Sequence, residues 1–135
     1  MVGDLSRRLD EALADNTRRL DEALADNAVQ IEGLERDHQR IVAASVDSNA
    51  DDEHDPEGAT IAFEREQLTA LLTRARLTRT ELEAARGRLD AGTYGICEGC
   101  GEAIVVERLH ARPAVRLCIG CASRPGRGWA AGGSG

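Results

Sequence analysis

Two short stretches decide the fold of the C-terminal third of this chain: CEGC at residues 97–100 and CIGC at residues 118–121. Each Cys-x-x-Cys forms a turn that aims two sulfurs at one point, and two such turns supply the tetrahedral set of four thiolates that zinc prefers. Four thiolates also close the coordination shell, which argues against catalysis by the metal. We therefore predict one structural Zn²⁺, and its ligands are Cys97, Cys100, Cys118 and Cys121.

The segment between the two cysteine pairs has too few apolar residues to form a stable core without a cross-link, so we expect the metal to drive folding. Gly99 and Gly101 flank Cys100, and glycine lets the backbone turn tightly and point its N–H groups at the thiolates. A redox use of the cysteines, or an iron or iron–sulfur centre, is the alternative. The redox alternative needs a thioredoxin-like βαβ context, which the sequence lacks.

The composition argues against several classes of protein. The 135 residues carry a net charge of −7, every basic side chain is arginine, and aromatic residues make up 2%. An acidic chain has no overall basic field for a nucleic-acid backbone, and so few aromatic side chains cannot fill a globular core. No apolar run approaches the ~20 residues that cross a bilayer, and no signal peptide is visible. We therefore expect a cytoplasmic protein with no membrane partner.

The N-terminal third contains an internal repeat: RRLDEALADN at residues 7–16 recurs unchanged at residues 18–27. The offset of eleven residues is close to three helical turns, so equivalent side chains return to nearly the same face. We predict one long amphipathic helix over about residues 4–46. We interpret the repeat as local duplication of a good helix former, with a docking surface as the alternative. The predicted seam runs through Leu9, Leu13, Leu20, Leu24, Ile31, Leu34, His38, Ile41, Val42 and Ser45.

A second helix is predicted over about residues 60–91, with Gly92 as its C-cap. Its start has two candidates: Asp55 as N-cap with Pro56 at the first helical position, or Thr60 as N-cap. Apolar residues spaced by seven are typical of a coiled-coil seam. The predicted seam positions are Ile61, Leu68, Leu71, Ala75, Leu82, Ala85 and Leu89.

Two long amphipathic helices joined by a short polar turn are expected to pair antiparallel. The predicted fold is mainly α: a long antiparallel coiled-coil hairpin with an acidic tip, plus a small four-cysteine zinc-finger domain. We place the hairpin at residues 1–91, its tip at about 47–59, the zinc finger at 92–123 and a flexible tail at 124–135. The longer first helix should overhang, and its N-terminal turns should pack against the segment after the second helix. A hairpin buries its seam within one chain, so we expect a monomer.

The tip is rich in carboxylates and has no arginine to offset them. Solvation of a protruding loop is the simplest explanation. A calcium loop is disfavoured because the spacing does not match D-x-[DN]-x-[DN]-G-x5-E. The third interpretation is a tip that enters a positively charged or metal-containing cavity of a partner, where a carboxylate can bias a bound Mg²⁺. The candidate tip residues are Asp51, Asp52, Asp55 and Glu57.

These features together resemble the DksA/TraR family of bacterial RNA polymerase regulators over about residues 50–123. The strongest stretches are GTYGICEGCG at 92–101, RLHARP at 108–113 and the second cysteine pair, and DPEGATIAFER at 55–65 resembles a subgroup. The resemblance implies a transcription regulator that binds RNA polymerase and inserts its coiled-coil tip into the secondary channel to modulate initiation. Strongly acting members carry D-x-x-D-x-A at the tip, whereas this chain has Glu57 at the alanine position.

Some members of the family bind the alarmone ppGpp through basic groups on the second helix, the second arginine of R-L-x-A-R-P and a lysine after the last cysteine. Arg112 matches that arginine, but Ala122 stands after the last cysteine and Glu81 stands where a basic residue is expected. The resemblance therefore implies a weak or absent ppGpp response. Arg74 is a candidate contact with the polymerase rim, with a solvated arginine as the alternative.

Three other classes of function are alternatives. A nucleic-acid-binding zinc ribbon rests on the residues from Gly92 onward, where five arginines against three glutamates leave a net charge of only +2, so we expect no direct sequence-specific DNA binding. A structural coiled-coil adaptor or dimer is the second class. An enzyme is least expected, because no Ser–His–Asp set, phosphate loop or open metal site is visible.

Overall fold

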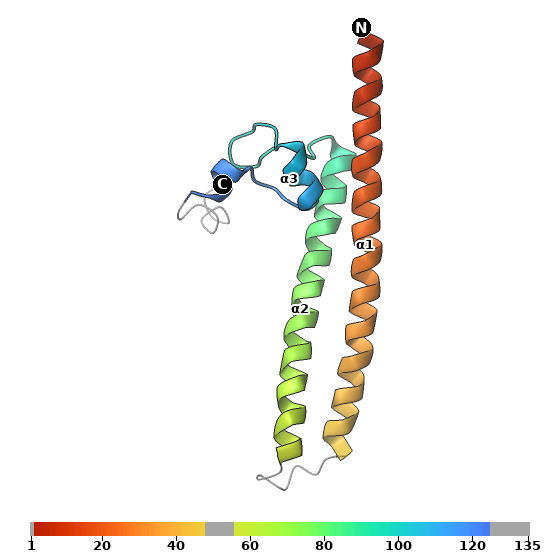
Figure 1. Cartoon of the computed structure of the whole chain (residues 1–135), viewed down its shortest axis with the longest axis vertical. Coiled ribbons are helices and arrows are strands. Elements are labelled where there is room, and N and C mark those ends of the chain that lie inside the picture. The colour runs from red at the N-terminus through yellow and green to blue at the C-terminus, as the bar shows by residue number, and fades with distance from the viewer. Residues whose placement is uncertain (1, 48–55, 125–135) are drawn as a thin grey trace. The chain divides into compact units, whose positions relative to one another are not determined.

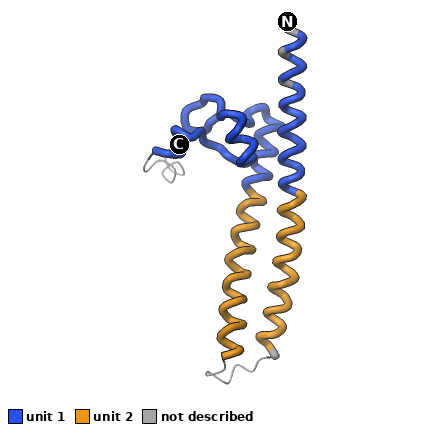
Figure 2. Tube along the Cα trace, viewed as in Figure 1, with its two compact units in different colours: residues 1–24, 81–135 blue, residues 25–80 orange. Residues whose placement is uncertain are grey.

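The computed structural model describes residues 2–47 and 56–124 and is mainly helical over these ranges (Figure 1). Its elements are α1 (Val2–Asp47), α2 (Pro56–Ala91), α3 (Val106–Ala111) and α4 (Ile119–Ala122). The chain forms two compact units (Figure 2): unit 1 comprises residues 1–24 and 81–135, and unit 2 comprises residues 25–80. Within the described ranges no helix is long and apolar enough to span a bilayer. The boundary at residue 92 between hairpin and zinc finger stays a prediction, because unit 1 combines the cysteine segment with parts of α1 and α2.

The ends of α2 follow from local sequence. The helix begins at Pro56 rather than at Thr60, and proline suits a first helical position because its φ is already fixed near the helical value. The Thr60 hydroxyl donates to the Pro56 carbonyl at 3.0 Å, which is a contact within the first turn. The other predicted N-cap, Asp55, lies outside the described residues.

The C-terminal end of α2 is closed by a Schellman motif, in which a left-handed residue lets two N–H groups turn back onto the last carbonyls. Gly92 has φ of 82°. The Thr93 N–H donates to the Arg88 carbonyl at 2.9 Å, and the Gly92 N–H donates to the Leu89 carbonyl at 3.2 Å. The predicted role of Gly92 as C-cap is confirmed.

Unit 2 pairs the C-terminal half of α1 with the N-terminal half of α2 in antiparallel orientation around a small apolar core. Buried Ile31, Leu72 and Ala75 form this core, and half-buried Leu34 packs against it. Leu71 was predicted for the seam but is 46% exposed. On a helical projection, Leu71 and Leu72 lie at similar angles on opposite sides of the line through Leu68 and Ala75. The seven-residue spacing therefore does not decide between them, and the side on which α1 lies does.

Polar contacts flank this core. Glu35 and Arg76 form an ion pair between the helices at 3.0 Å, and the Nε2 atom of His38 lies 3.3 Å from the Thr69 hydroxyl. His38 is half-buried at the edge of the seam, as predicted. Asn27 was not predicted for the seam, yet it is buried and its Nδ2 donates to the Ala75 carbonyl at 3.0 Å.

Unit 1 contains the other part of the seam. Leu20 is fully buried against Leu82 and Ala85, and this cluster is covered by half-buried neighbours: Ala23, Leu24, Leu89, Tyr94 and Ala114. Leu13, also predicted for the seam, is instead 49% exposed. Every side chain described between residues 3 and 14 is exposed. Among the described side chains, α1 contacts the segment after α2 from Asp15 onward, where Asp15 faces His110 and the Leu20 cluster meets Tyr94. The expectation that the N-terminal turns of α1 pack against that segment therefore does not hold for the described side chains of residues 3–14.

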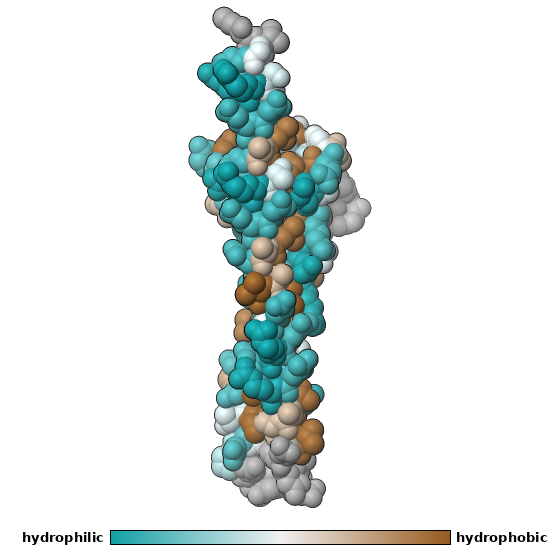
Figure 3. Space-filling view, turned by 90° about the vertical axis from the view of Figure 1, so that its right-hand side faces the viewer, coloured by the Kyte–Doolittle hydropathy of each residue, from teal (hydrophilic) through white to brown (hydrophobic). Residues whose placement is uncertain are grey.

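The face shown in Figure 3 is mainly hydrophilic, with apolar side chains in separate patches along it. Two large apolar side chains of α2, Phe63 and Leu77, are about 60% exposed. Such isolated side chains cost little in water, since single exposed apolar residues are common on soluble proteins.

The buried and exposed leucines of α2 make a matched pair. Leu82→Ala should destabilise the protein by about 2–5 kcal/mol, because a side chain that is 5% exposed leaves a cavity in the unit 1 core. Leu77→Ala, at 60% exposure on the same helix, should change the free energy of unfolding by less than about 0.5 kcal/mol. Urea unfolding followed by circular dichroism measures both values, and equal losses would contradict the assigned core.

Candidate metal centre

The structure brings the four predicted ligands together. Their sulfur atoms all lie within 4.8 Å of one another, and the Cys100 and Cys118 sulfurs are 3.9 Å apart. Four Zn–S bonds of about 2.3 Å in a tetrahedron place the sulfurs about 3.8 Å apart. Cys97 and Cys121 are buried, whereas Cys100 is exposed. The spacing of the sulfurs therefore fits one tetrahedral zinc ion close to the surface.

Backbone hydrogen bonds hold the first cysteine turn. An isolated antiparallel β-bridge joins Ile96 to Ala103 on either side of the turn. The Cys97 N–H donates to the Glu102 carbonyl at 2.8 Å. The Gly99 N–H donates to the Cys97 sulfur at 3.3 Å, as predicted for a glycine of this turn. The companion prediction for the glycine at position 101 is wrong: its N–H donates to the Cys97 carbonyl at 2.9 Å, and its φ of 79° explains the need for glycine.

The second cysteine turn opens the short helix α4. Cys118 is its N-cap, and its sulfur accepts the Cys121 N–H at 3.4 Å. The Cys118 N–H in turn donates to the Cys97 sulfur at 3.3 Å, so the two turns share a hydrogen bond. The Arg108 side chain supports this arm by donating Nε to the Leu117 carbonyl at 2.9 Å.

The electrostatics of the cluster call for a cation. Burial disfavours the Cys97 thiolate, but N–H groups of Cys118, Cys100 and Gly99 donate to its sulfur and lower its pKa to about 6. The hydrogen bond to Cys97, with burial next, raises the pKa of Cys121 to about 12. Four adjacent thiolates repel one another, so all four ionise only when a bound metal compensates their charge.

The apolar core around the sulfurs is small. Ile104 and Leu109 are the buried aliphatic residues beside Cys97 and Cys121, whereas Val105 and the residue after it are more than half exposed. Half of the buried cluster thus consists of metal ligands. This agrees with the expectation that the metal supplies the cross-link that the apolar residues alone do not provide.

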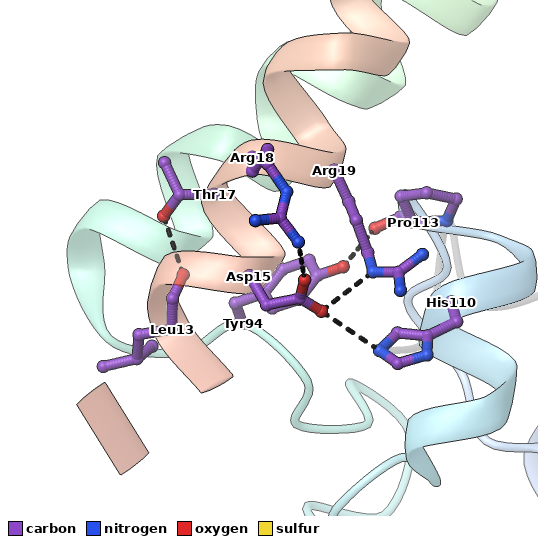
Figure 4. A network of polar contacts seen from close by, with 8 residues as sticks. All are labelled: Leu13, Asp15, Thr17, Arg18, Arg19, Tyr94, His110 and Pro113. Carbon is purple, nitrogen blue, oxygen red and sulfur yellow. Dashed lines mark hydrogen bonds and ion pairs between the residues drawn. The ribbon is translucent and has the colours of Figure 1, made fainter. Parts of the chain in front are cut away.

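A polar network that was not predicted from the sequence attaches this region to α1 (Figure 4). The Asp15 carboxylate accepts Arg19 Nε at 2.9 Å and pairs with Arg18, and it lies 3.5 Å from His110 Nε2 on α3. The hydrogen bond from Arg19 is the main cause that lowers the pKa of Asp15. Nearby, the Tyr94 hydroxyl donates to the carbonyl of residue 113 at 2.8 Å. No sequence signal pairs two residues so far apart in the chain.

The remaining predicted site residues are not part of this centre. Asp51, Asp52 and Asp55 lie outside the described residues, and Glu57 is exposed in the first turn of α2. The candidate contact arginines fall in different units. Arg74 is exposed on α2 in unit 2, and Arg112 is exposed directly after α3 in unit 1.

Unit 2 also has a groove between α1 and α2 with a volume of about 460 Å³. Its apolar part consists of Ile41, Leu68 and Leu71, and charged side chains of both helices flank it. Arg74 follows Leu71 by three residues on α2 and so lies near one edge of this groove.

Gly99 is placed so that a larger residue would disturb the metal centre. A Cβ atom at this position would lie 2.9 Å from the Cys121 sulfur, whereas one at Gly120 would meet the Cys118 sulfur at an ordinary 3.8 Å. We expect Gly99→Ala to lower the affinity for zinc roughly tenfold or more and Gly120→Ala to leave it nearly unchanged. Competition with a chromophoric chelator measures both affinities, and equal affinities would contradict the assigned packing around Cys121.

Removal of zinc by a chelator should unfold the cysteine region and spare unit 2, which has its own core of Ile31, Leu72 and Ala75. Hydrogen exchange measures this as lost protection of the amides of Ile104 and Leu109, with residues 25–80 retaining theirs. Full protection of both amides after chelation would show that the metal is not needed for folding.

Comparison with known proteins agrees with this geometry. Residues 92–125 match the family model of the prokaryotic dksA/traR C4-type zinc finger. Over 69 residues the chain is 38% identical to the RNA polymerase-binding transcription factor DksA of Haemophilus influenzae. The aligned stretch covers 49% of this chain and 48% of that protein. Over 65 residues the chain is 40% identical to the uncharacterized protein YteA of Bacillus subtilis, covering 48% of this chain and 27% of that protein. The chain thus spans about half or less of the length of these curated relatives.

The fold has a solved counterpart. The structure of transcription factor DksA2 from Pseudomonas aeruginosa superposes with a TM-score of 0.70 and 27% sequence identity, covering 84% of this chain and 82% of that one. The four clustered cysteines therefore bind one structural zinc ion, as predicted. The zinc-finger match over residues 92–125, the DksA relative and the shared fold together support the DksA/TraR family for this chain.

Proposed function

We propose that this chain is a transcription factor that binds RNA polymerase and acts through protein contact. The observation that carries the proposal is the shared fold with DksA2 over 84% of the chain, because it extends the likeness from the zinc finger to both long helices. A relative in sequence is named an RNA polymerase-binding transcription factor. A structural zinc with four protein ligands leaves no open position for chemistry, which agrees with a regulator and not with an enzyme.

We further propose that the helix pair enters the secondary channel of the polymerase, with the connection between α1 and α2 leading. This connection holds the tip carboxylates Asp51, Asp52 and Asp55. Negative charge brought near a catalytic Mg²⁺ or its basic surroundings changes the local field directly. The carboxylates are therefore the proposed effectors of initiation, and the exposed Glu57 at the start of α2 extends the same negative charge.

The proposed polymerase contacts outside the tip are Arg74 and Arg112. Both side chains are exposed, and arginine is among the residues enriched in protein interfaces. A strong ppGpp response is not proposed. Ala122 after the last cysteine and Glu81 on α2 supply no positive charge for a phosphate, and both are exposed rather than paired in a basic site.

We propose that the protein acts in the cytoplasm as a monomer and without direct recognition of DNA. The net charge of −7 supports this, because non-specific affinity for DNA comes mainly from basic side chains at phosphates. The seam of each unit is filled by residues of the same chain, which supports a monomer.

The test separates binding from effect. In a purified transcription assay, Asp52→Asn combined with Asp55→Asn should abolish the change in initiation while polymerase binding stays within about threefold, because charge near the active centre is lost but the docking surface remains. The matched control neutralises two exposed carboxylates of α1, Asp10→Asn with Glu11→Gln, and should keep both properties.

Two outcomes contradict the proposal in different ways. If the chain is not retained by purified RNA polymerase, the partner is wrong. If it is retained but the variant at Asp52 and Asp55 regulates initiation normally, the partner stands and the tip mechanism is wrong. A salt-dependent shift of free DNA by the protein alone would instead favour a nucleic-acid-binding module.

A further inference from the structure

The repeat in α1 duplicates the whole surface that unit 1 uses to hold this helix. The α1 residues that contact α2 or the zinc region there, or that position the Asp15 contact, are Asp15, Arg19, Leu20, Asp21, Ala23 and Leu24. Eleven residues earlier stand Asp4, Arg8, Leu9, Asp10, Ala12 and Leu13. Each residue of the second set is identical to its counterpart, so the N-terminal turns carry a complete second copy of a surface whose complement is known.

The contacts of the copy in use define what that surface binds. Leu20 is fully buried against Leu82 and Ala85. The Arg86 Nε donates to the Asp21 carboxylate at 3.2 Å. The complement is therefore a leucine–alanine seam on α2 with an arginine at its border, followed by the histidine of α3 that faces Asp15.

The described side chains of the first copy are exposed, and their ion pairs are already arranged in the same way. Asp4 pairs with Arg7 at 2.7 Å and with Arg8 at 3.2 Å. These pairs repeat the pattern of Asp15 with the two arginines that follow it by three and four residues. Asp10 and Leu13 of this copy are exposed, so neither side chain is engaged in the present arrangement.

We propose that α1 has a second register on α2, displaced by eleven residues, in which residues 4–13 take the place of residues 15–24. Eleven residues correspond to three turns within about 20° and to a displacement of about 16 Å along the helix axis. Equivalent side chains would therefore face α2 and the zinc region with nearly the same orientation. In this second register, residues 4–13 pack on the same α2 surface that residues 15–24 now contact, and no other molecule is needed.

The contacts of unit 2 tolerate the same displacement. Asn16 would take the place of Asn27 opposite the Ala75 carbonyl, and Leu20 would take the place of Ile31 in the core. The losses fall at Leu34, whose place would be taken by the smaller Ala23, and at Glu35, whose place opposite Arg76 would be taken by Leu24. Ile41, which lines the groove, would be replaced by Gln30. The present register keeps these contacts and is therefore the more stable of the two.

The connection does not forbid the displacement. Residues 48–55 form an eight-residue link between α1 and α2, and an extended chain of that length reaches about 26 Å. The two registers depend only on the pairing of the helices and on neither the polymerase nor the tip. Their test is therefore independent of the proposed function.

Two substitutions distinguish the registers. Leu24→Glu places a charge in the unit 1 core, but in the second register position 24 takes the place of Glu35, where a glutamate meets Arg76. Leu13 would then take the place of residue 24 in the apolar core of unit 1. Leu13→Glu alone should be silent, because Leu13 is 49% exposed in the present register. In combination with Leu24→Glu it should block both registers.

The readout is an intramolecular cross-link in the full-length zinc-loaded protein. A p-benzoyl-phenylalanine at position 10, which is exposed in the present register, would face Arg86 in the second one. We expect Leu24→Glu to raise the yield of cross-links from position 10 to residues 82–90 several-fold. Adding Leu13→Glu should return the yield to that of the otherwise unchanged chain. An unchanged yield in the Leu24→Glu protein, or adducts of two chains only, would overturn the proposal.

Thermal unfolding gives a second measurement if Leu24→Glu is poorly folded. With two registers, Leu13→Glu should lower the midpoint by several degrees in the Leu24→Glu background and leave it unchanged in the wild-type background. With a single register the exposed residue 13 should have no effect in either background. Additive effects of the two substitutions would therefore contradict the second register.

Discussion

Four sulfur atoms within 4.8 Å of one another cannot all be negative unless a cation lies among them, and this constraint supports the rest of unit 1. Two of the ligands, Cys97 and Cys121, are also half of the buried cluster to which Ile104 and Leu109 belong. Tyr94 packs against this cluster and also against the seam formed by α1 and α2. Charge compensation at the metal therefore also stabilises, through Tyr94, the apolar seam between α1 and α2.

The helix pair is stabilised mainly by its narrow seam and less by its many ions. Ion pairs such as Arg86 with Asp21 and Arg76 with Glu35 lie at the surface with substantial exposure, and such pairs contribute about 0–1 kcal/mol each. The buried leucines of the seam contribute more, at about 1.5–3 kcal/mol for each fully buried side chain. A chain with few aromatic residues thus obtains its stability from length of contact and not from a wide core.

The sequence predicted those features that local chemistry determines. The spacing of the cysteines identified the ligand set, and a glycine in the left-handed region explained the end of α2 at Ala91. It did not decide between Leu71 and Leu72, because both flank the same line on the helix. The sequence also placed Leu13 in the seam, although the observed seam does not extend to this residue. The apolar pattern of one helix does not show where its partner helix stops. The contact of Asp15 with His110 joins two segments that only the tertiary fold brings together.

Asn27 has a consequence for how the helices find each other. Its amide is buried, its Nδ2 meets the Ala75 carbonyl, and its Oδ1 has no partner among the described residues. Sliding α1 by one turn or one heptad would take the amide away from that carbonyl and leave it buried without a hydrogen bond, which costs about 1–3 kcal/mol. Misaligned pairings are therefore raised in energy, and the folding landscape favours discrete alignments over a continuum. Because the preceding asparagine on α1 is Asn16, eleven residues earlier, it also sets the size of the step between alignments that share this hydrogen bond.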